Sequence, residues 1–149
     1  MSNIHGSVPT QNVIKDEFGW EIPVEMVPVP SEGKVYPEGT ALHNRKGIKI
    51  KAMTAREEDI LSSQALIKEG TVISHLIESC VIDKSINIRD MLLGDRNALM
   101  VSIRITGYGS AYSAHATCPE CSARSSQDFN LSELEIKTLD IEPVTPGEN

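Results

Sequence analysis

Apolar side chains recur with helical spacing in the middle of the chain, and residues that favour helix ends bound these runs. Thr54 and Glu57 have the spacing of a capping box, in which the threonine oxygen accepts from the amide three residues on and the glutamate reaches back. Gly70 is placed to end this first helix. Thr71 opens a second run, which continues to Val81 with its apolar residues on one face. The pattern predicts two consecutive helices.

The apolar segment after Asp95 fits two different periods. Leu99 and Ile103 are spaced as on one face of a helix, whereas every second residue from 99 to 105 is also apolar, as in a strand. Asp95 at one end and Gly107 at the other bracket about three helical turns, which favours a helix. We predict a third helix here, with Asp95 as its N-cap.

Two further segments predict strands. Residues 47–52 alternate apolar and basic side chains, with Ile48 and Ile50 on one side, which is typical of a short half-exposed strand. Later in the chain, two short runs of mixed polar and apolar residues flank Cys118 and Cys121, and they predict a β-hairpin with a CxxC knuckle at its tip. Together the elements predict an α+β fold, with two to three helices packed on a small antiparallel sheet.

The first 34 residues lack helical periodicity and are rich in proline. Five of the eight prolines precede residue 40, and proline fixes φ, removes an amide donor and favours an extended preceding residue. We predict that residues 1–34 form an extended proline-rich N-terminal arm that contacts a partner protein. The alternative is that its tryptophan packs back onto its own domain. The candidate partner-binding residues are Phe18, Trp20, Val27, Pro28 and Pro30.

The sequence therefore divides into three parts. The arm over residues 1–34 precedes an α+β domain over residues 35–140, and residues 141–149 return to proline and glycine and predict a C-terminal tail. Aromatic residues make up only 4% of the 149 residues. Few large side chains are therefore available to fill the core, and a partner is expected to order parts of the chain.

The charge and hydropathy of the chain narrow the range of partners. A net charge of −7, from 21 acidic and 14 basic residues, argues against a nucleic-acid-binding surface, which needs clustered Lys and Arg. No run approaches the roughly 18 apolar residues that cross a bilayer. The N-terminus has neither the basic nor the apolar region of a signal peptide. We expect neither nucleic acid nor a membrane as a partner, and a cytoplasmic location when the protein is made.

The paired cysteines are the strongest candidates for a chemical site. Two residues between Cys118 and Cys121 let both sulfurs converge on one zinc ion at about 2.3 Å. Two thiolates are only half of a tetrahedral shell, and the chain has no second CxxC. His115, three residues before Cys118, and Cys80 are the further candidate ligands for this zinc ion, although Cys80 also fits a small core residue on its helix. The remaining sources of ligands are His43, His75 and another copy of the chain.

A redox role is the rival interpretation of the same cysteines. Dithiol oxidoreductases place the first cysteine at a helix N-terminus, where the dipole lowers its pKa, but residues 124–130 predict a strand. The chain also lacks the serine-hydrolase, phosphate-loop, zinc-protease and dinucleotide-binding motifs. The sequence therefore predicts a protein that is not an enzyme.

A longer stretch carries a resemblance to a known family. The segment GDRNALMVSIRITGYGSAYSAHATCPEC, followed by FNLSELEIKTLDIEP, resembles the small baseplate protein family of T-even-type contractile-tailed bacteriophages, which is associated with the baseplate hub and its assembly. The upstream segment VYPEGTALHNRKGIKIKAMTAREEDIL fits the same family, so the resemblance covers residues 28–144. The family's knuckle corresponds to Cys118 and Cys121 only.

The resemblance implies structural work rather than catalysis. It predicts a virion structural or tail-assembly component of a contractile tail, in the hub region, that works through contacts with other baseplate or tail proteins in a multi-subunit assembly. It places the protein in the host cytoplasm during assembly, and in the tail baseplate of the virion if it is retained. The alternative function is a stand-alone zinc-knuckle adaptor that recruits a partner to a complex.

Overall fold

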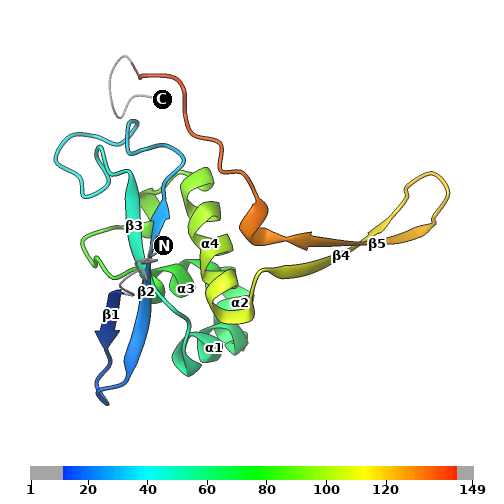
Figure 1. Ribbon diagram of the computed structural model, residues 1–149, viewed down its shortest axis with the longest axis horizontal. Coiled ribbons are helices and arrows are strands. Elements are labelled where there is room, and N and C mark those ends of the chain that lie inside the picture. The colour runs from blue at the N-terminus through cyan, green and yellow to red at the C-terminus, as the bar shows by residue number, and fades with distance from the viewer. Residues whose placement is uncertain (1–11, 144–149) are drawn as a thin grey trace, which may run out of the picture.

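A three-stranded sheet, four α-helices and a separate two-stranded hairpin make up residues 12–143, the part of the chain that the computed structural model describes (Figure 1). The predicted α+β class is confirmed. The elements run in the order β1 (Asn12–Lys15), β2 (Glu21–Pro28), β3 (Gly47–Lys51), α1 (Ala55–Ser62), α2 (Gln64–Glu69), α3 (Val72–Cys80), η1 (Ile88–Asp90), α4 (Leu93–Tyr108), β4 (Ala111–Thr117), β5 (Arg124–Asn130) and η2 (Leu131–Glu133), where η marks a 3-10 helix.

The predicted helices are present, with one more break than expected. The segment from Thr54 to Gly70, which the pattern predicts as one helix, forms α1 and α2, and this makes four α-helices instead of two or three. The break lies at Ser63, whose backbone is extended and whose hydroxyl accepts from the amide of Leu66. Gly70 ends α2 in the left-handed conformation, with φ of 71°, which glycine adopts without strain.

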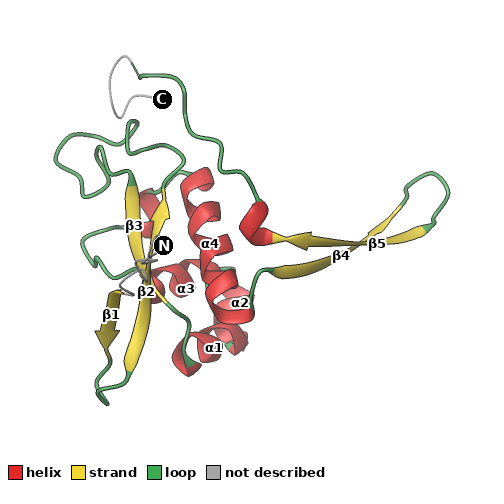
Figure 2. Cartoon of the chain, in the orientation of Figure 1, coloured by secondary structure: helices red, strands yellow, loops and turns green. Residues whose placement is uncertain are grey.

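The sheet is antiparallel in the order β1-β2-β3, and helices cover one of its faces (Figure 2). Ile48 and Ile50 of β3 are buried and Lys49 between them is exposed, as the alternating pattern predicted. These isoleucines pack with residues from β2, α3 and α4 in a single core. The buried members of that core are Val27, Val29, Tyr36, Leu42, Ile48, Ile50, Leu76, Ile77, Cys80, Val81, Ile86, Ile88, Met91, Leu99 and Ile103.

The prediction that residues 1–34 form an arm outside the domain is wrong for the described residues of that range. Strand β2 is the central strand of the sheet, and Val27 pairs with Ile48 of β3. The prolines are tolerated because they lie at the ends of the β2–β3 ladder. The carbonyl of Pro23 accepts from the amide of Ala52, which lies just after β3. Pro28 pairs with Gly47, the first residue of β3. Residues 1–11 lie outside the described range.

The segment after the hairpin runs back along the body of the protein toward the β2–β3 connection (Figure 1). The amide of Leu139 donates to the carbonyl of Pro30 at 2.8 Å, and the ammonium of Lys34 lies 2.8 Å from Glu142. The predicted tail over residues 141–149 is described only as far as residue 143.

The predicted helix after Asp95 is confirmed as α4, but Asp95 is not its N-cap. The helix begins at Leu93, so Asp95 lies in the first turn, where it is buried. Its carboxylate accepts from the amide of Ser31 at 2.9 Å, from the hydroxyl of Ser31 at 2.6 Å and from the hydroxyl of Tyr36 at 2.5 Å. Two causes raise the pKa of Tyr36 far above its usual value: the larger is burial, and the smaller is the hydrogen bond to Asp95. These bonds join α4 to the β2–β3 connection.

A second buried carboxylate joins α1 to the sheet and to α3. The capping box over Thr54 and Glu57 is present, and the Glu57 carboxylate accepts from the Thr54 amide at 2.9 Å. The same carboxylate accepts from the ammonium of Lys51 in β3 and from the hydroxyl of Ser79 in α3, each at 2.5 Å. Burial alone would raise the pKa of Glu57, but the hydrogen bonds from Lys51, Ser79 and Thr54 outweigh it and lower the pKa to about 2.

This geometry predicts an acid-sensitive fold. Because the pKa of Glu57 falls from 4.5 to about 2 on folding, its contribution to stability is complete above pH 4.5 and is lost as the pH falls toward 2. That contribution is on the order of 3 kcal/mol. We expect Glu57→Gln to lower the free energy of unfolding by a few kcal/mol at pH 7, and the difference from the wild type to shrink as the pH falls. Urea unfolding at pH 7, 4.5 and 3 measures both effects.

Glu58→Gln is the matched control, because Glu58 is exposed one residue further along the same helix. It should change the free energy of unfolding by less than about 1 kcal/mol. Parallel pH profiles for the wild type and Glu57→Gln would contradict this account of Glu57.

Candidate functional site

Two exposed features project from the body of the protein, and the first is the turn between β1 and β2. We call residues 16–20 the aromatic turn. The carboxylate of Asp16 accepts from the amides of Phe18 and Trp20 at 2.9 and 2.8 Å, and the amide of Asp16 donates to the carbonyl of Trp20 at 3.0 Å. Gly19 has φ of 81°, a left-handed conformation that glycine supplies without strain. The hydrogen bonds give the backbone of the turn a defined conformation.

The aromatic turn presents both of its large side chains to solvent. Phe18 is 79% exposed and Trp20 is 73% exposed, so the alternative in which Trp20 packs back onto its own domain does not hold in this structure. Large aromatic side chains that are left in water on a defined turn are typical of protein interfaces. A shallow groove between this turn and the start of α1 is lined by Ile14, Phe18, Ile22, Thr54 and Arg56, among others.

The other three predicted partner-binding residues lie in different environments. Val27 is only 1% exposed and packs in the core, so its prediction as a partner-binding residue is wrong. Its side chain points inward because it pairs with buried Ile48. Pro28 is exposed at the end of β2, and Pro30 is half-buried under the C-terminal segment.

The second projecting feature is the hairpin of β4 and β5, which we call the cysteine hairpin (residues 111–130). Seven residue pairs form its antiparallel ladder, from Ala111 with Asn130 to Thr117 with Arg124, and the ribbon extends away from the helices (Figure 1). No residue of either strand is buried. The hairpin therefore has no hydrophobic core of its own.

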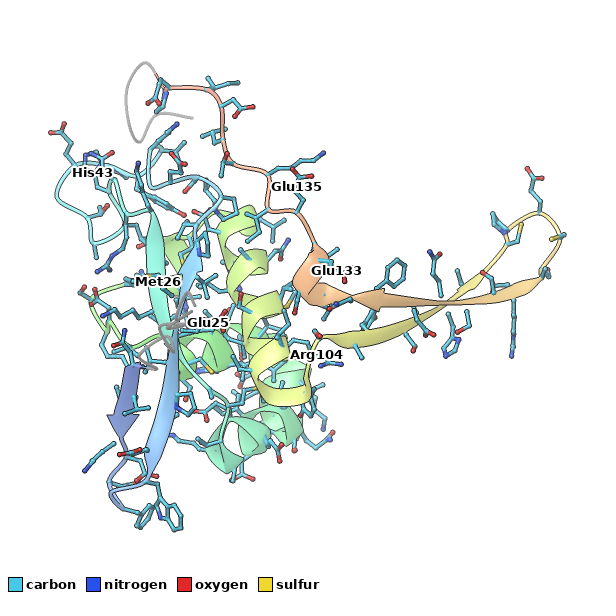
Figure 3. The ribbon with its side chains drawn as sticks, viewed as in Figure 1. Glu25, Met26, His43, Arg104, Glu133 and Glu135 are labelled. Carbon is cyan, nitrogen blue, oxygen red and sulfur yellow. The ribbon has the colours of Figure 1, made fainter. Side chains whose placement is uncertain are left out.

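Side chains near the base of the cysteine hairpin connect it to α4. Arg104, which is labelled in Figure 3, donates to the carbonyl of Gly109 at 2.9 Å and to the carbonyl of Ala111 in β4 at 3.4 Å, and it lies 5.1 Å from the ring centre of Tyr108. Tyr112 and Phe129 pair directly across the two strands, and they are 47% and 41% exposed. An aromatic cross-strand pair stabilises a hairpin by roughly 0.2–1 kcal/mol, and here it also offers an apolar patch.

Sequence reasoning did not single out Tyr112 and Phe129 as candidate contact residues. A signal was available, because the predicted strands on either side of the cysteines contain few other apolar residues. A strand pair without an alternating apolar face cannot be packed on a core, so its isolated aromatics must face either solvent or a partner.

The loop at the hairpin tip holds Cys118 and Cys121, which are both exposed and free. The amide of Cys118 donates to the carbonyl of Ala123 at 2.9 Å, and the amide of Ser122 donates back to the carbonyl of Cys118 at 3.0 Å. Ser122 has φ of 57°, which turns the chain back toward β5. The amides of Cys121 and Glu120 hydrogen-bond to the Cys118 sulfur and lower the pKa of its thiol.

The described residues supply no further ligand to this pair. Within residues 12–143, no group of three or more His, Cys, Asp and Glu side chains is arranged to hold a metal ion, so His115 is not gathered with the two cysteines. The prediction of Cys80 as a possible metal ligand is wrong, because Cys80 is fully buried in the core. Burial raises the pKa of the Cys80 thiol to about 11. After Cys121 the chain enters strand β5. The cysteine pair therefore lacks the following helix that lowers the thiol pKa in dithiol oxidoreductases.

Among the helices of residues 12–143, none has the length and hydropathy required to span a membrane.

The fold and the two projecting features define an α+β protein whose distinctive residues lie on exposed extensions rather than in a cleft. Comparison with protein families shows that the chain belongs to the family described as T4 bacteriophage base plate protein, whose model matches residues 27–148. The chain is thus a component of a phage baseplate. No curated protein and no solved structure matches the chain. The family match includes the cysteine hairpin and begins after the aromatic turn.

The three cysteines should differ sharply in reactivity. In the native reduced protein, with a chelator present, we expect Cys118 and Cys121 to react with a thiol reagent as freely as peptide thiols. We expect Cys80 to react at least about 100-fold more slowly, because its exposure requires unfolding. Time-resolved mass spectrometry counts the modified thiols, and Cys118→Ser should remove one fast reaction. Three equal rates, or a single fast thiol in the wild type, would contradict these placements.

Proposed function

We propose that this baseplate protein is a structural or assembly subunit of the hub region that works through protein–protein contacts and not as an enzyme. The observation that carries the proposal is the cysteine hairpin, in which no residue of β4 or β5 is buried. An isolated two-stranded hairpin is marginally stable in water. Contact with a neighbouring subunit would cover the ribbon and order it.

The arrangement of the hairpin on α4 supports a docking role. Helix α4 is fixed to the body by the buried Asp95, and the cysteine hairpin leaves from its C-terminal end. Tyr112 and Phe129 then place apolar surface just outside the body. A fixed base with an exposed ribbon suits β-strand addition or a side-chain contact by a neighbouring protein.

The aromatic turn supports a second contact. The aromatic turn joins β1 and β2 at the lower end of the three-stranded sheet, whereas the cysteine hairpin leaves from the opposite side of the helices (Figure 1). Two separated contact elements allow one subunit to join two neighbours, as a component of a larger assembly must.

The hub placement and the cellular setting rest on the resemblance of residues 28–144 to hub-associated baseplate proteins of contractile tails. The partners are other baseplate or tail proteins, and neither nucleic acid nor a membrane. The protein meets them in the host cytoplasm during assembly and lies in the tail of the virion if it is retained. The net charge of −7 favours partners with basic surfaces, because complementary charge accelerates association.

Removing the cysteine hairpin tests the proposal directly. Ser110 and Leu131 are joined by a backbone hydrogen bond of 2.8 Å, so a short Gly-Ser linker can replace residues 111–130. We expect the free energy of unfolding to change by less than about 1 kcal/mol, because the strands contribute nothing to the core. We expect the variant to fail to join the baseplate when it is co-expressed with the other baseplate proteins of the same phage.

The same co-expression assay separates the two contact elements. Phe18→Ala with Trp20→Ala should leave the fold intact and weaken association by roughly 30-fold or more, as for aromatic residues at the centre of an interface. Ile67→Ala is the matched control, since it truncates an exposed apolar side chain on α2. Normal incorporation of the hairpin-deleted protein would refute the docking role.

A further inference from the structure

The tip of the cysteine hairpin carries half of a metal site. Cys118 and Cys121 are exposed on a loop whose backbone is closed by two hydrogen bonds between Cys118 and residues 122 and 123. The two intervening residues match the spacing at which both sulfurs can bind one tetrahedral ion. Thiolate ligands select zinc over the hard cations magnesium and calcium.

The chain cannot complete this site with the described residues. No third His, Cys, Asp or Glu of residues 12–143 is gathered with the pair, and Cys80 is enclosed in the core. Structural zinc sites in proteins are closed by four protein ligands. Residues 12–143 therefore leave two ligand positions open, and another polypeptide can fill both of them.

A second copy of the same chain is the occupant that the geometry fits. A two-fold axis through the ion would bring a second Cys118 and Cys121 to it, and the four sulfurs would form a closed shell of four cysteine ligands. The contact is isologous, since each copy contributes the same loop and receives the same loop. It therefore closes after two copies and does not propagate into a filament.

The hairpin is long enough to keep the negatively charged bodies of two paired copies apart. Seven paired residues at about 3.3 Å each give a ribbon of roughly 20 Å, so two tips that meet would hold the bodies about 40 Å apart. Each body belongs to a chain with a net charge of −7. At physiological salt the Debye length is about 8 Å, so the repulsion between two bodies at that separation is largely screened.

We propose that two copies of this chain join tip to tip through one zinc ion held by Cys118 and Cys121 of each copy. Each thiol loses its proton as its sulfur binds, so two chains and one Zn²⁺ give the four-thiolate complex and release four protons. The metal does not change its oxidation state. The inference extends the proposed function, since the paired subunits would present two bodies to the baseplate.

The test uses the full-length purified protein, reduced and freed of metal, and titrated with Zn²⁺ alone. We expect one zinc ion per two chains and a mass that doubles with zinc and returns to the monomer with a chelator. Titration with Co²⁺ should give the sulfur-to-cobalt charge-transfer intensity of four thiolates. Native mass spectrometry reads the stoichiometry directly.

Variants identify the ligands. Cys118→Ser and Cys121→Ser should each stay monomeric with zinc and keep the wild-type free energy of unfolding, because both side chains are exposed. His115→Ala should bind zinc and pair like the wild type. The proposal is overturned by one zinc ion per monomer, by no zinc binding at micromolar concentrations, or by loss of pairing in His115→Ala. Because no baseplate partner is present, none of these results bears on the docking role of the hairpin.

Discussion

The structure depends on one constraint, which is that the hydrophobic core is complete before the chain reaches the cysteine hairpin. The buried apolar residues run from Ile22 to Ile103, and none of the described residues after Ile103 is buried. The body can therefore fold without the hairpin. The hairpin, in turn, depends on its backbone hydrogen bonds, on a few cross-strand pairs such as Tyr112 with Phe129, and on whatever covers it.

Two buried carboxylates join the helices and strands of the body from which the aromatic turn and the cysteine hairpin project. Asp95 joins the start of α4 to the β2–β3 connection through Ser31 and Tyr36, and Glu57 joins α1 to β3 and α3. A buried carboxylate that lost its hydrogen-bond donors would raise the free energy of the folded state. These two carboxylates therefore strongly favour the one arrangement of helices and strands in which their donors are in place. Asp95 holds α4 in place, and α4 in turn sets the direction in which the hairpin leaves the body. The placement of the cysteine hairpin is thus a consequence of polar contacts made far from it in the sequence.

The local features of the fold were predictable from the sequence, whereas its long-range features were not. The capping box at Thr54, the left-handed stop at Gly70 and the alternation around Ile48 each act within a few residues, and the structure has all three. The prolines of β2 suggested an arm, because their position at the ends of a ladder depends on partners in or next to β3, 19 residues after Pro28 and 29 residues after Pro23. Asp95 was expected to cap its own helix, since nothing near it in the sequence indicates Ser31 or Tyr36.

In the candidate site, too, the local features were predictable from the sequence and the long-range features were not. The exposed cysteine pair is a local motif and was found, as were the exposed aromatics of the turn between β1 and β2. Val27 and Cys80 were candidates by residue type, and only the packing of distant elements shows that both lie in the core. The chain belongs to a baseplate family, and its exposed extensions are the parts that we propose contact its neighbours.

Amide hydrogen exchange of the cysteine hairpin, in the isolated metal-free protein and in the assembled baseplate complex, tests this account most directly. If the ribbon is ordered by its neighbours, its amides exchange within seconds to minutes in the isolated protein, while those of β2 and β3 stay protected. In the complex the hairpin amides become at least about 100-fold slower. Hairpin amides that are already as protected as those of β2 and β3 in the isolated protein, or that stay unprotected in the complex, would contradict it.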